Sequence, residues 1–111
     1  MKGRNPTADE KRHMDRVSQI GCIVCKNQGN YFVPTEIHHT EGKTKEEAHF
    51  KVLPLCYEHH RQGVMNGMWV SRHPWKKEFE KRYGTELELL KQVKEILNLL
   101  KQNLSLQKKR Y

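Results

Sequence analysis

The chain has 111 residues, of which 35% are hydrophobic and 31% charged, so its length suits one domain with a thin apolar core. Its formal net charge is +8, from 21 Lys and Arg against 13 Asp and Glu, and a small protein this basic most often meets a polyanion. No apolar run approaches the roughly 20 residues of a membrane span, and the N-terminus lacks an apolar stretch. Neither a membrane partner nor a secretory signal is therefore expected.

The first half of the chain predicts a helix followed by a β-hairpin. Thr7 and Glu10 have the capping-box spacing, and the helix over residues 8–20 carries an apolar stripe before Gly21 ends it. The stripe consists of Met14, Val17 and Ile20. After the turn-rich residues 26–30, a short β-type run covers residues 31–33. A strand over residues 35–39 and a return strand over residues 50–55 then flank a polar loop.

The second half of the chain predicts mainly helices. One begins at Cys56 and ends before Gly63, residues 64–72 are irregular, and Pro74 is the first position of a helix that ends at Tyr83. Thr85 and Glu88 form a second capping box ahead of the last helix. The apolar face of that helix, which packs on the domain or pairs with a second copy, consists of Leu87, Leu90, Val93, Leu97 and Leu100. Both a monomer and a homodimer are compatible with it.

Two paired-ligand motifs predict a structural zinc site. Cys22 and Cys25 form a C-x-x-C pair, and Cys56 and His59 form a C-x-x-H pair about thirty residues later. In a chain without a signal peptide, this odd number of cysteines favours metal ligation over disulfides and a reducing compartment, the cytoplasm. The alternative is three buried cysteines and one surface histidine. Two converging pairs make that alternative the weaker one.

Further histidines suggest a second cluster. Neighbours on a strand point to opposite faces, so of His38 and His39 one can bind an ion while the other faces the substrate. His60 lies about 100° around its helix from the preceding residue and can join His38. A later ligand completes the set, either His73 or the side-chain oxygen of Asn66. Without a metal, the same histidines are solvated or contact phosphate.

These segments resemble a family of nucleases. A strand ending in His38-His39, a return strand and a helix opened by metal ligands is similar to the ββα-metal, or HNH, pattern. The similarity is closer to the phage recombination-enhancement nucleases that depend on RecA, the Ref-type group, and covers most of residues 4–90. It is carried by Arg4-Asn5-Pro6-Thr7-Ala8, Gly21-Cys22-Ile23-Val24-Cys25, Glu36-Ile37-His38-His39, His49-Phe50, Pro54-Leu55-Cys56 and His59-His60-Arg61.

The resemblance implies an α+β fold, with a small ββα-metal (HNH) core and zinc knuckles flanked by an N-terminal helix and two C-terminal helices. Residues 1–111 are then one HNH nuclease domain, with a core of about 20–84 and a C-terminal helix of about 85–104. By this resemblance His38 binds the catalytic ion with His60 and His73, and His39 is the general base. The central Asn of the HNH signature is replaced by Lys51, and His49 is expected to brace the loop instead.

The function implied is a metal-dependent DNA endonuclease that hydrolyses phosphodiester bonds in phage or prophage recombination. The bacterial cytoplasm is its expected location and a RecA filament its expected partner. Phosphate contacts supply most of the affinity for single- or double-stranded DNA, and nothing is built to read base edges, so sequence specificity is low. The candidate phosphate-binding residues are Lys43, Lys45, Arg61, Arg72, Lys76, Lys77, Lys81 and Arg82.

The identity of the catalytic ion stays open from sequence. Mg²⁺ prefers oxygen ligands, whereas imidazole sets favour Zn²⁺ or Mn²⁺. Two other functions share the zinc site. A non-catalytic zinc-stabilised DNA-binding module explains the charge but has no use for the cluster of His38, His39, His60 and His73. A protein-interaction zinc module leaves the net charge of +8 unexplained.

Overall fold

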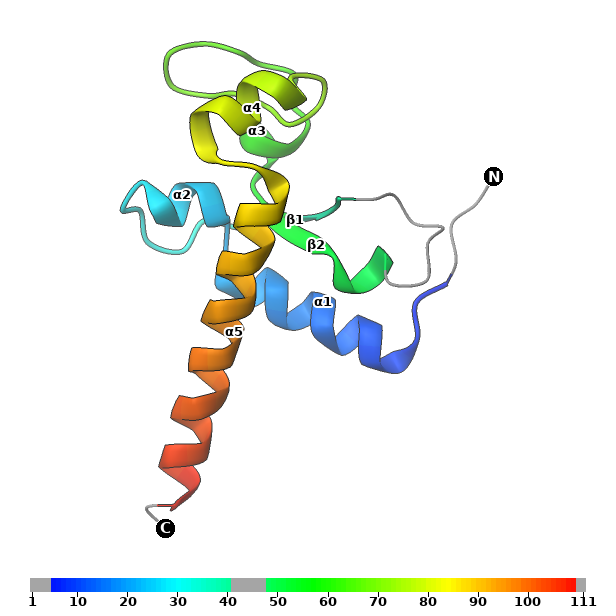
Figure 1. The fold of residues 1–111 in the computed structure, drawn as a ribbon, viewed down its shortest axis with the longest axis vertical. Coiled ribbons are helices and arrows are strands. Elements are labelled where there is room, and N and C mark those ends of the chain that lie inside the picture. Colours follow the sequence, from blue (N-terminus) through cyan, green and yellow to red (C-terminus); the bar gives the residue numbers. More distant parts are fainter. Residues whose placement is uncertain (1–4, 41–47, 110–111) are drawn as a thin grey trace.

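The computed structural model of the protein describes residues 5–40 and 48–109, and of residues 103–109 the backbone alone. Helices surround a two-stranded antiparallel hairpin, so the fold is α+β, as predicted (Figure 1). Helix α1 (Ala8–Ile20) begins at the predicted capping box, in which Thr7 Oγ1 accepts from Glu10 N at 3.2 Å and Glu10 Oε1 from Thr7 N at 2.7 Å. Gly21 ends the helix with a φ of 82°, a conformation that favours glycine.

The segment after α1 differs from its prediction. A short helix, α2 (Ile23–Asn27), follows Cys22 as its N-cap and contains Cys25, and the turn-rich composition of residues 26–30 did not predict it. The prediction of a β-type run over residues 31–33 is wrong, because these residues form no strand. Tyr31 is 96% exposed and Phe32 is 61% exposed. The run therefore lacks the half-buried neighbours that stabilise β-prone residues in a sheet.

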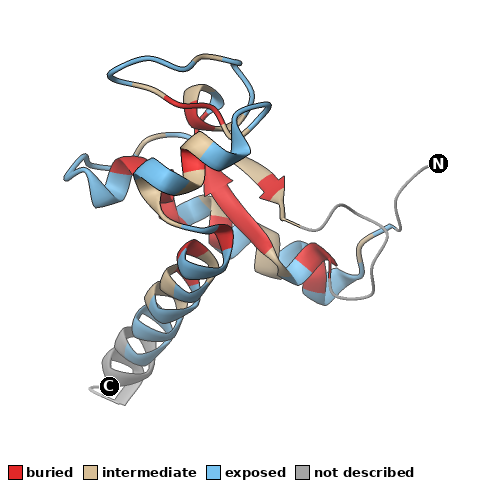
Figure 2. Cartoon of the chain, turned by 45° about the horizontal axis from the view of Figure 1, so that its top comes forward, coloured by how far each residue is buried: buried red, intermediate tan, exposed pale blue. Residues whose placement is uncertain are grey.

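The hairpin consists of β1 (Glu36–His39) and β2 (Val52–Leu55), with the 3₁₀ helix η1 (Ala48–Phe50) directly before β2. The two strands pair antiparallel, with His38 opposite Leu53. Helices α1, α2, α3 and α5 all contact β2, and the strand is buried along its whole length (Figure 2). Because β1 is buried only in part, its alternating side chains can reach two different surfaces.

Helix α3 (Tyr57–His60) follows the hairpin, and an irregular segment with one isolated bridge leads to α4 (Lys76–Tyr83). The prediction that Pro74 is the first helical residue is wrong. Pro74 follows a cis peptide bond, and Trp75 has φ −95° and ψ 50°, outside the helical region, so α4 begins only at the residue after it.

Helix α5 (Glu86–Lys109) begins at the second predicted capping box. Thr85 N donates to Glu88 Oε1 at 2.9 Å, and Glu88 N donates to Thr85 Oγ1 at 3.1 Å. Its buried contacts come from Leu89 and Val93, whereas Leu87 is 77% exposed. The predicted apolar face is therefore wrong at Leu87, because the helix turns Leu89 toward the core in its place.

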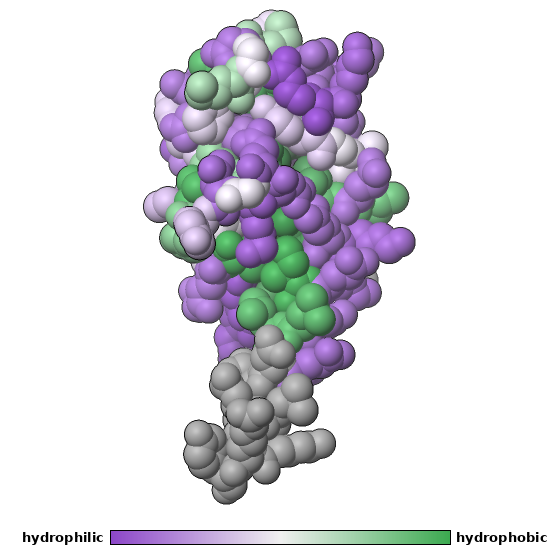
Figure 3. Space-filling model, turned by 90° about the vertical axis from the view of Figure 1, so that its left-hand side faces the viewer, coloured by the Kyte–Doolittle hydropathy of each residue, from purple (hydrophilic) through white to green (hydrophobic). Residues whose placement is uncertain are grey.

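The core is built around β2, on which α1, α2 and α5 pack, and α4 adds Phe79 to it. Its members include Val17, Ile23, Leu53, Leu55 and Leu89. Beyond this core, α5 continues past α1 along the longest dimension of the molecule (Figure 1). Figure 3 shows apolar surface gathered above the C-terminal end, with hydrophilic surface on both sides. Within the described residues, no helix has the length and apolar character needed to cross a membrane.

Candidate metal centres

The first centre gathers the two predicted ligand pairs in the interior. Cys22 is the N-cap of α2 and Cys25 lies one turn into it, while Cys56 and His59 have the same relation in α3. Residues three apart on a helical turn lie on one side of it, so each short helix presents two ligand atoms to the other. All four side chains are buried, and their ligand atoms lie within 4.8 Å of one another.

The distances suit a tetrahedral ion. His59 Nδ1 lies 3.6 Å from the sulfurs of Cys22 and Cys25 and 3.2 Å from that of Cys56. Cys25 Sγ and Cys56 Sγ are 3.8 Å apart. Around a zinc ion bonded at about 2.3 Å to sulfur and about 2.0 Å to nitrogen, ligand atoms are separated by about 3.5–3.8 Å. The donor set and its spacing therefore fit zinc.

The electrostatics of this pocket also favour a cation. The pKa of Cys22 falls to about 4, mainly because Cys56 donates a hydrogen bond to its sulfur. The pKa of Cys25 rises to about 11 through burial and the negative charge of Cys22, and that of Cys56 rises as well. The three thiols thus compete for negative charge, and ionisation of one opposes ionisation of the others. A divalent cation would allow all three sulfurs to ionise.

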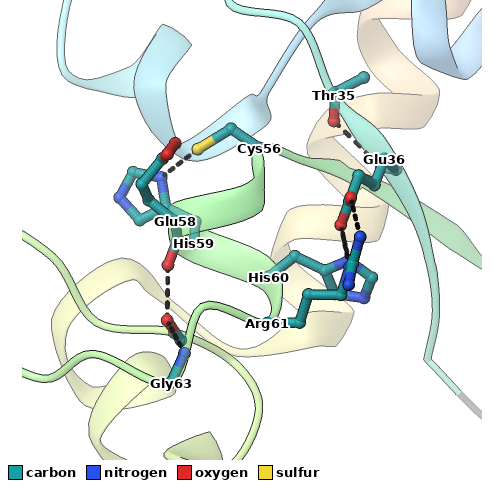
Figure 4. A network of polar contacts seen from close by, with 9 residues as sticks. Thr35, Glu36, Cys56, Glu58, His59, His60, Arg61 and Gly63 are labelled. Carbon is teal, nitrogen blue, oxygen red and sulfur yellow. Dashed lines mark hydrogen bonds and ion pairs between the residues drawn. The ribbon is translucent and has the colours of Figure 1, made fainter.

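The second centre joins three histidines from separate segments. His38 lies on β1, His60 ends α3, and His73 precedes Pro74, yet their ligand atoms lie within 4.8 Å of one another. Backbone bonds place His73 here, because its N–H donates to the carbonyl of His60 at 2.9 Å. Adjacent residues of α3 thus serve different centres, with His59 turned toward Cys56 and His60 toward Glu36 (Figure 4).

Two carboxylates hold two of these rings. Glu36 Oε1 accepts from His60 Nδ1 at 2.8 Å, and the same carboxylate accepts two bonds from Arg61 at 2.9 and 2.8 Å (Figure 4). Glu86 Oε2 lies 2.5 Å from His38 Nε2 and accepts from Arg72 Nε at 3.0 Å. Imidazoles that bind metals commonly place their second nitrogen against a carboxylate, which fixes the ring.

These contacts set the charges around the histidine cluster. The bonds from Arg61 and His60 lower the pKa of Glu36 to about 2. Burial alone would raise the pKa of Glu86, but its bonds with His38 and Arg72 outweigh burial and lower it. Burial lowers the pKa of His60, and also that of His73. The carboxylates are therefore anionic and these two imidazoles neutral at pH 7, the form in which imidazole binds metal.

His39 points to the opposite side of β1. Its Nε2 lies 3.0 Å from Nδ1 of His49, and the two rings meet edge to face with centroids 5.1 Å apart. His49 is buried in η1, whereas His39 is half-buried. The strand alternation expected for His38 and His39 is present, and His49 contacts the side chain of His39.

The remaining predicted site residues lie in varied surroundings. The Asn66 side-chain oxygen accepts from the N–H groups of Met68 and Trp69, so Asn66 caps its own turn. Arg61 and Arg72 pair with Glu36 and Glu86 as described above. The other candidates on α4, namely Lys76, Lys77, Lys81 and Arg82, range from exposed to partly exposed. Lys43 and Lys45 lie outside the described residues.

Sequence reasoning missed Glu36 and Glu86 as partners of the histidines. Glu36 had a usable signal, because residues two apart on a strand share a face, and it lies two positions before His38. Glu86 had none, since 48 residues separate it from His38 and only the packing of α5 brings the two together.

The fold and the two clusters define a small α+β protein with one Cys₃His site and one three-histidine site. The protein-family profile described as recombination enhancement, RecA-dependent nuclease matches residues 6–98. The chain therefore belongs to the recombination-enhancement, RecA-dependent nuclease family. The family is named for a nuclease, so nucleic acid is the substrate class that comes with membership.

Proposed function

We propose that this protein is an HNH-type endonuclease that hydrolyses phosphodiester bonds of DNA with a divalent ion. The observation that supports this most directly is the pair His38 and His39. One lies within 4.8 Å of two other histidines, and its neighbour lies on the opposite side of the strand. A module that only binds DNA has no need of a second imidazole cluster with carboxylate partners.

In this mechanism His38, His60 and His73 hold the catalytic ion. Glu36 and Glu86 orient the rings and leave His38 Nδ1 and His60 Nε2 as the donor atoms, since the other nitrogens face carboxylates. When bound, the ion supplies positive charge to the scissile phosphate and the leaving oxygen. Its identity is proposed among Mg²⁺, Mn²⁺ and Zn²⁺, and neutral imidazoles favour the latter two.

His39 is the proposed general base. Its ring lies on the side of β1 opposite His38 and contacts His49, and an imidazole placed there can accept the proton of the attacking water. His49 then holds the ring in one orientation, which is the bracing task expected of it in place of the Asn of the HNH signature. Imidazole suits this role in general, because its ordinary pKa of about 6.5 leaves the ring able to accept a proton at neutral pH.

The Cys22, Cys25, Cys56 and His59 cluster is proposed to hold a structural zinc ion that fixes α2 against α3. Affinity for single- or double-stranded DNA is proposed to come from phosphate contacts with little sequence specificity. Arg61, Lys76 and Lys77 are the first candidates among the described residues. We further propose that the protein acts with a RecA filament. Its role would be in phage or prophage recombination in the host cytoplasm.

A cleavage assay tests the proposal. Purified protein is incubated with supercoiled and with single-stranded DNA, with and without a RecA filament, in Mg²⁺, in Mn²⁺ or without added divalent ion. We expect cleavage that requires the ion and falls about 100-fold or more in His39→Ala, the loss typical of a missing general base. Tyr31→Ala, at a position 96% exposed, is the control and keeps full activity.

Two results would contradict the proposal. Equal cleavage by His39→Ala and the wild type would remove the assignment of the base. DNA binding without cleavage in any ion, with or without RecA, would instead favour the non-catalytic zinc-stabilised DNA-binding module.

A further inference from the structure

A groove between α1 and α5 lies outside the proposed catalytic residues. It consists of two hollows, of about 900 and 1020 Å³. Both are lined by His13, Lys94 and Leu97, so they adjoin and form one continuous groove. We call it the α1–α5 groove.

The rim of the α1–α5 groove is basic. Among the described residues, each hollow is lined by four Lys or Arg side chains, with Lys94 common to both, and the two together have three carboxylates. All three acids accept hydrogen bonds: Glu86 from Arg72, Asp15 from Gln19 and Glu80 from the N–H of Glu86. Of the cations, Arg12 pairs with Asp9 and Lys76 lies 3.9 Å from Glu86. The groove therefore presents a surplus of positive charge, which complements a polyanion.

The floor of the groove is apolar. Phe50 is 45% exposed there, and its ring centroid lies 5.3 Å from that of His13. Leu87, exposed at the surface of α5, and Leu97 continue the apolar lining. An exposed aromatic ring on an apolar floor beneath cationic walls suits a single strand, whose bases stack on the floor while its phosphates meet the walls. A duplex keeps its bases stacked inside and would leave the floor unused.

The groove also adjoins the histidine cluster. Glu86 lines its upper hollow and contacts His38 at 2.5 Å. From Glu86 the lining continues along α5 to Lys101. These two residues are fifteen positions apart, so at about 1.5 Å per residue the lining extends about 22 Å along the helix. A strand lying in the groove would thus end next to the cluster.

We propose that the α1–α5 groove binds single-stranded nucleic acid and leads it to the histidine cluster. The inference deepens the proposed nuclease function and rests on it. It adds cationic residues of α1 and α5, such as Arg16, Lys94 and Lys101, that the sequence did not single out for DNA binding.

A measurement of DNA affinity tests this inference independently of cleavage. Fluorescence anisotropy of a labelled single-stranded oligonucleotide is measured without added divalent ion in the His39→Ala background. Adding Lys94→Glu and Lys101→Glu should weaken binding on the order of tenfold and lower the slope of log affinity against log salt by about 0.7 for each lost phosphate contact. Lys11→Glu with Lys26→Glu, at two exposed positions that do not line the groove, gives the same net charge and should change affinity much less.

A second variant tests the floor without altering charge. Phe50→Ala should weaken single-strand binding about fivefold or more, the loss expected for one stacked base, with an unchanged circular dichroism spectrum. If the groove variants and the control bind the oligonucleotide with equal affinity, the α1–α5 groove is not the binding site, even if cleavage requires His39. If a duplex binds more tightly than the single strand and depends on the same lysines, the occupant of the groove is a duplex and the proposal is wrong on this point. Groove-dependent binding by a wild type that never cleaves DNA would remove the proposed nuclease function and leave the groove.

Discussion

Two kinds of residue make up the histidine cluster and its surroundings. Some could bind an ion themselves, and others orient the side chains that could bind it. Glu36 belongs to the second kind, because it accepts from His60 and from Arg61 at once. Its low pKa keeps it anionic over the whole working range of pH. The orientation of His60 thus depends on a carboxylate that does not itself bind the ion.

Glu36→Gln should therefore weaken the proposed catalytic ion without unfolding the protein. Loss of such a partner typically lowers metal affinity about 10- to 100-fold. Titration with Mn²⁺ followed by calorimetry measures this, and the cleavage rate at saturating ion should recover in part. Glu95→Gln on the exposed side of α5 is the matched control. An unchanged Mn²⁺ affinity in Glu36→Gln would mean that Glu36 serves the Arg61 pair alone.

Among the helices and strands, the local signals in the sequence were the reliable ones. Both capping boxes were predicted, because the side chain and the backbone group that it satisfies are three residues apart. The strand prediction at residues 31–33 and the placement of Leu87 failed because burial depends on distant neighbours. The contact of Glu86 with His38 was missed for the same reason, whereas the C-x-x-C and C-x-x-H spacings pointed to four side chains that the structure brings together.

Helix α1 offers a test of local stability. Thr7→Ala removes the side chain that caps Glu10 N and should lower the free energy of unfolding by about 1 kcal/mol. Urea denaturation of the two proteins measures the difference. Thr35→Ala is a useful comparison, because the Thr35 hydroxyl bonds only its neighbour's carbonyl among the described contacts, and it should cost less. A stability equal to that of the wild type would show that the first turn gains nothing from the cap.

At the scale of the whole molecule, the Cys₃His cluster lies within a thin apolar core. Its ligands come from α2 and α3, which lie on either side of the buried strand β2 in the sequence. A structural zinc ion contributes its binding free energy to folding, so the proposed ion would contribute to the stability of the entire fold.

Removal of that ion should unfold the protein. Cys22→Ser, which replaces one thiolate, is expected to give an unfolded or aggregated chain, and a strong chelator should lower the melting temperature of the wild type. Circular dichroism during heating measures both. Ser105→Ala, a change distant in sequence from the cysteines, is the control. A Cys22→Ser protein with wild-type melting would contradict the structural role of the cluster.

One turn of helix, α3, contributes ligands to both clusters: His59 faces the cysteines and its neighbour His60 faces His38 and His73. Inserting or deleting a single residue between Cys56 and His59 would rotate whatever follows by about 100° and move both rings out of their present environments. Laboratory variants should therefore tolerate extra length at the exposed turn around Gly67, ahead of His73, but none within the turn of α3. The stretch most sensitive to changes of length is thus also the shortest α-helix among the described residues.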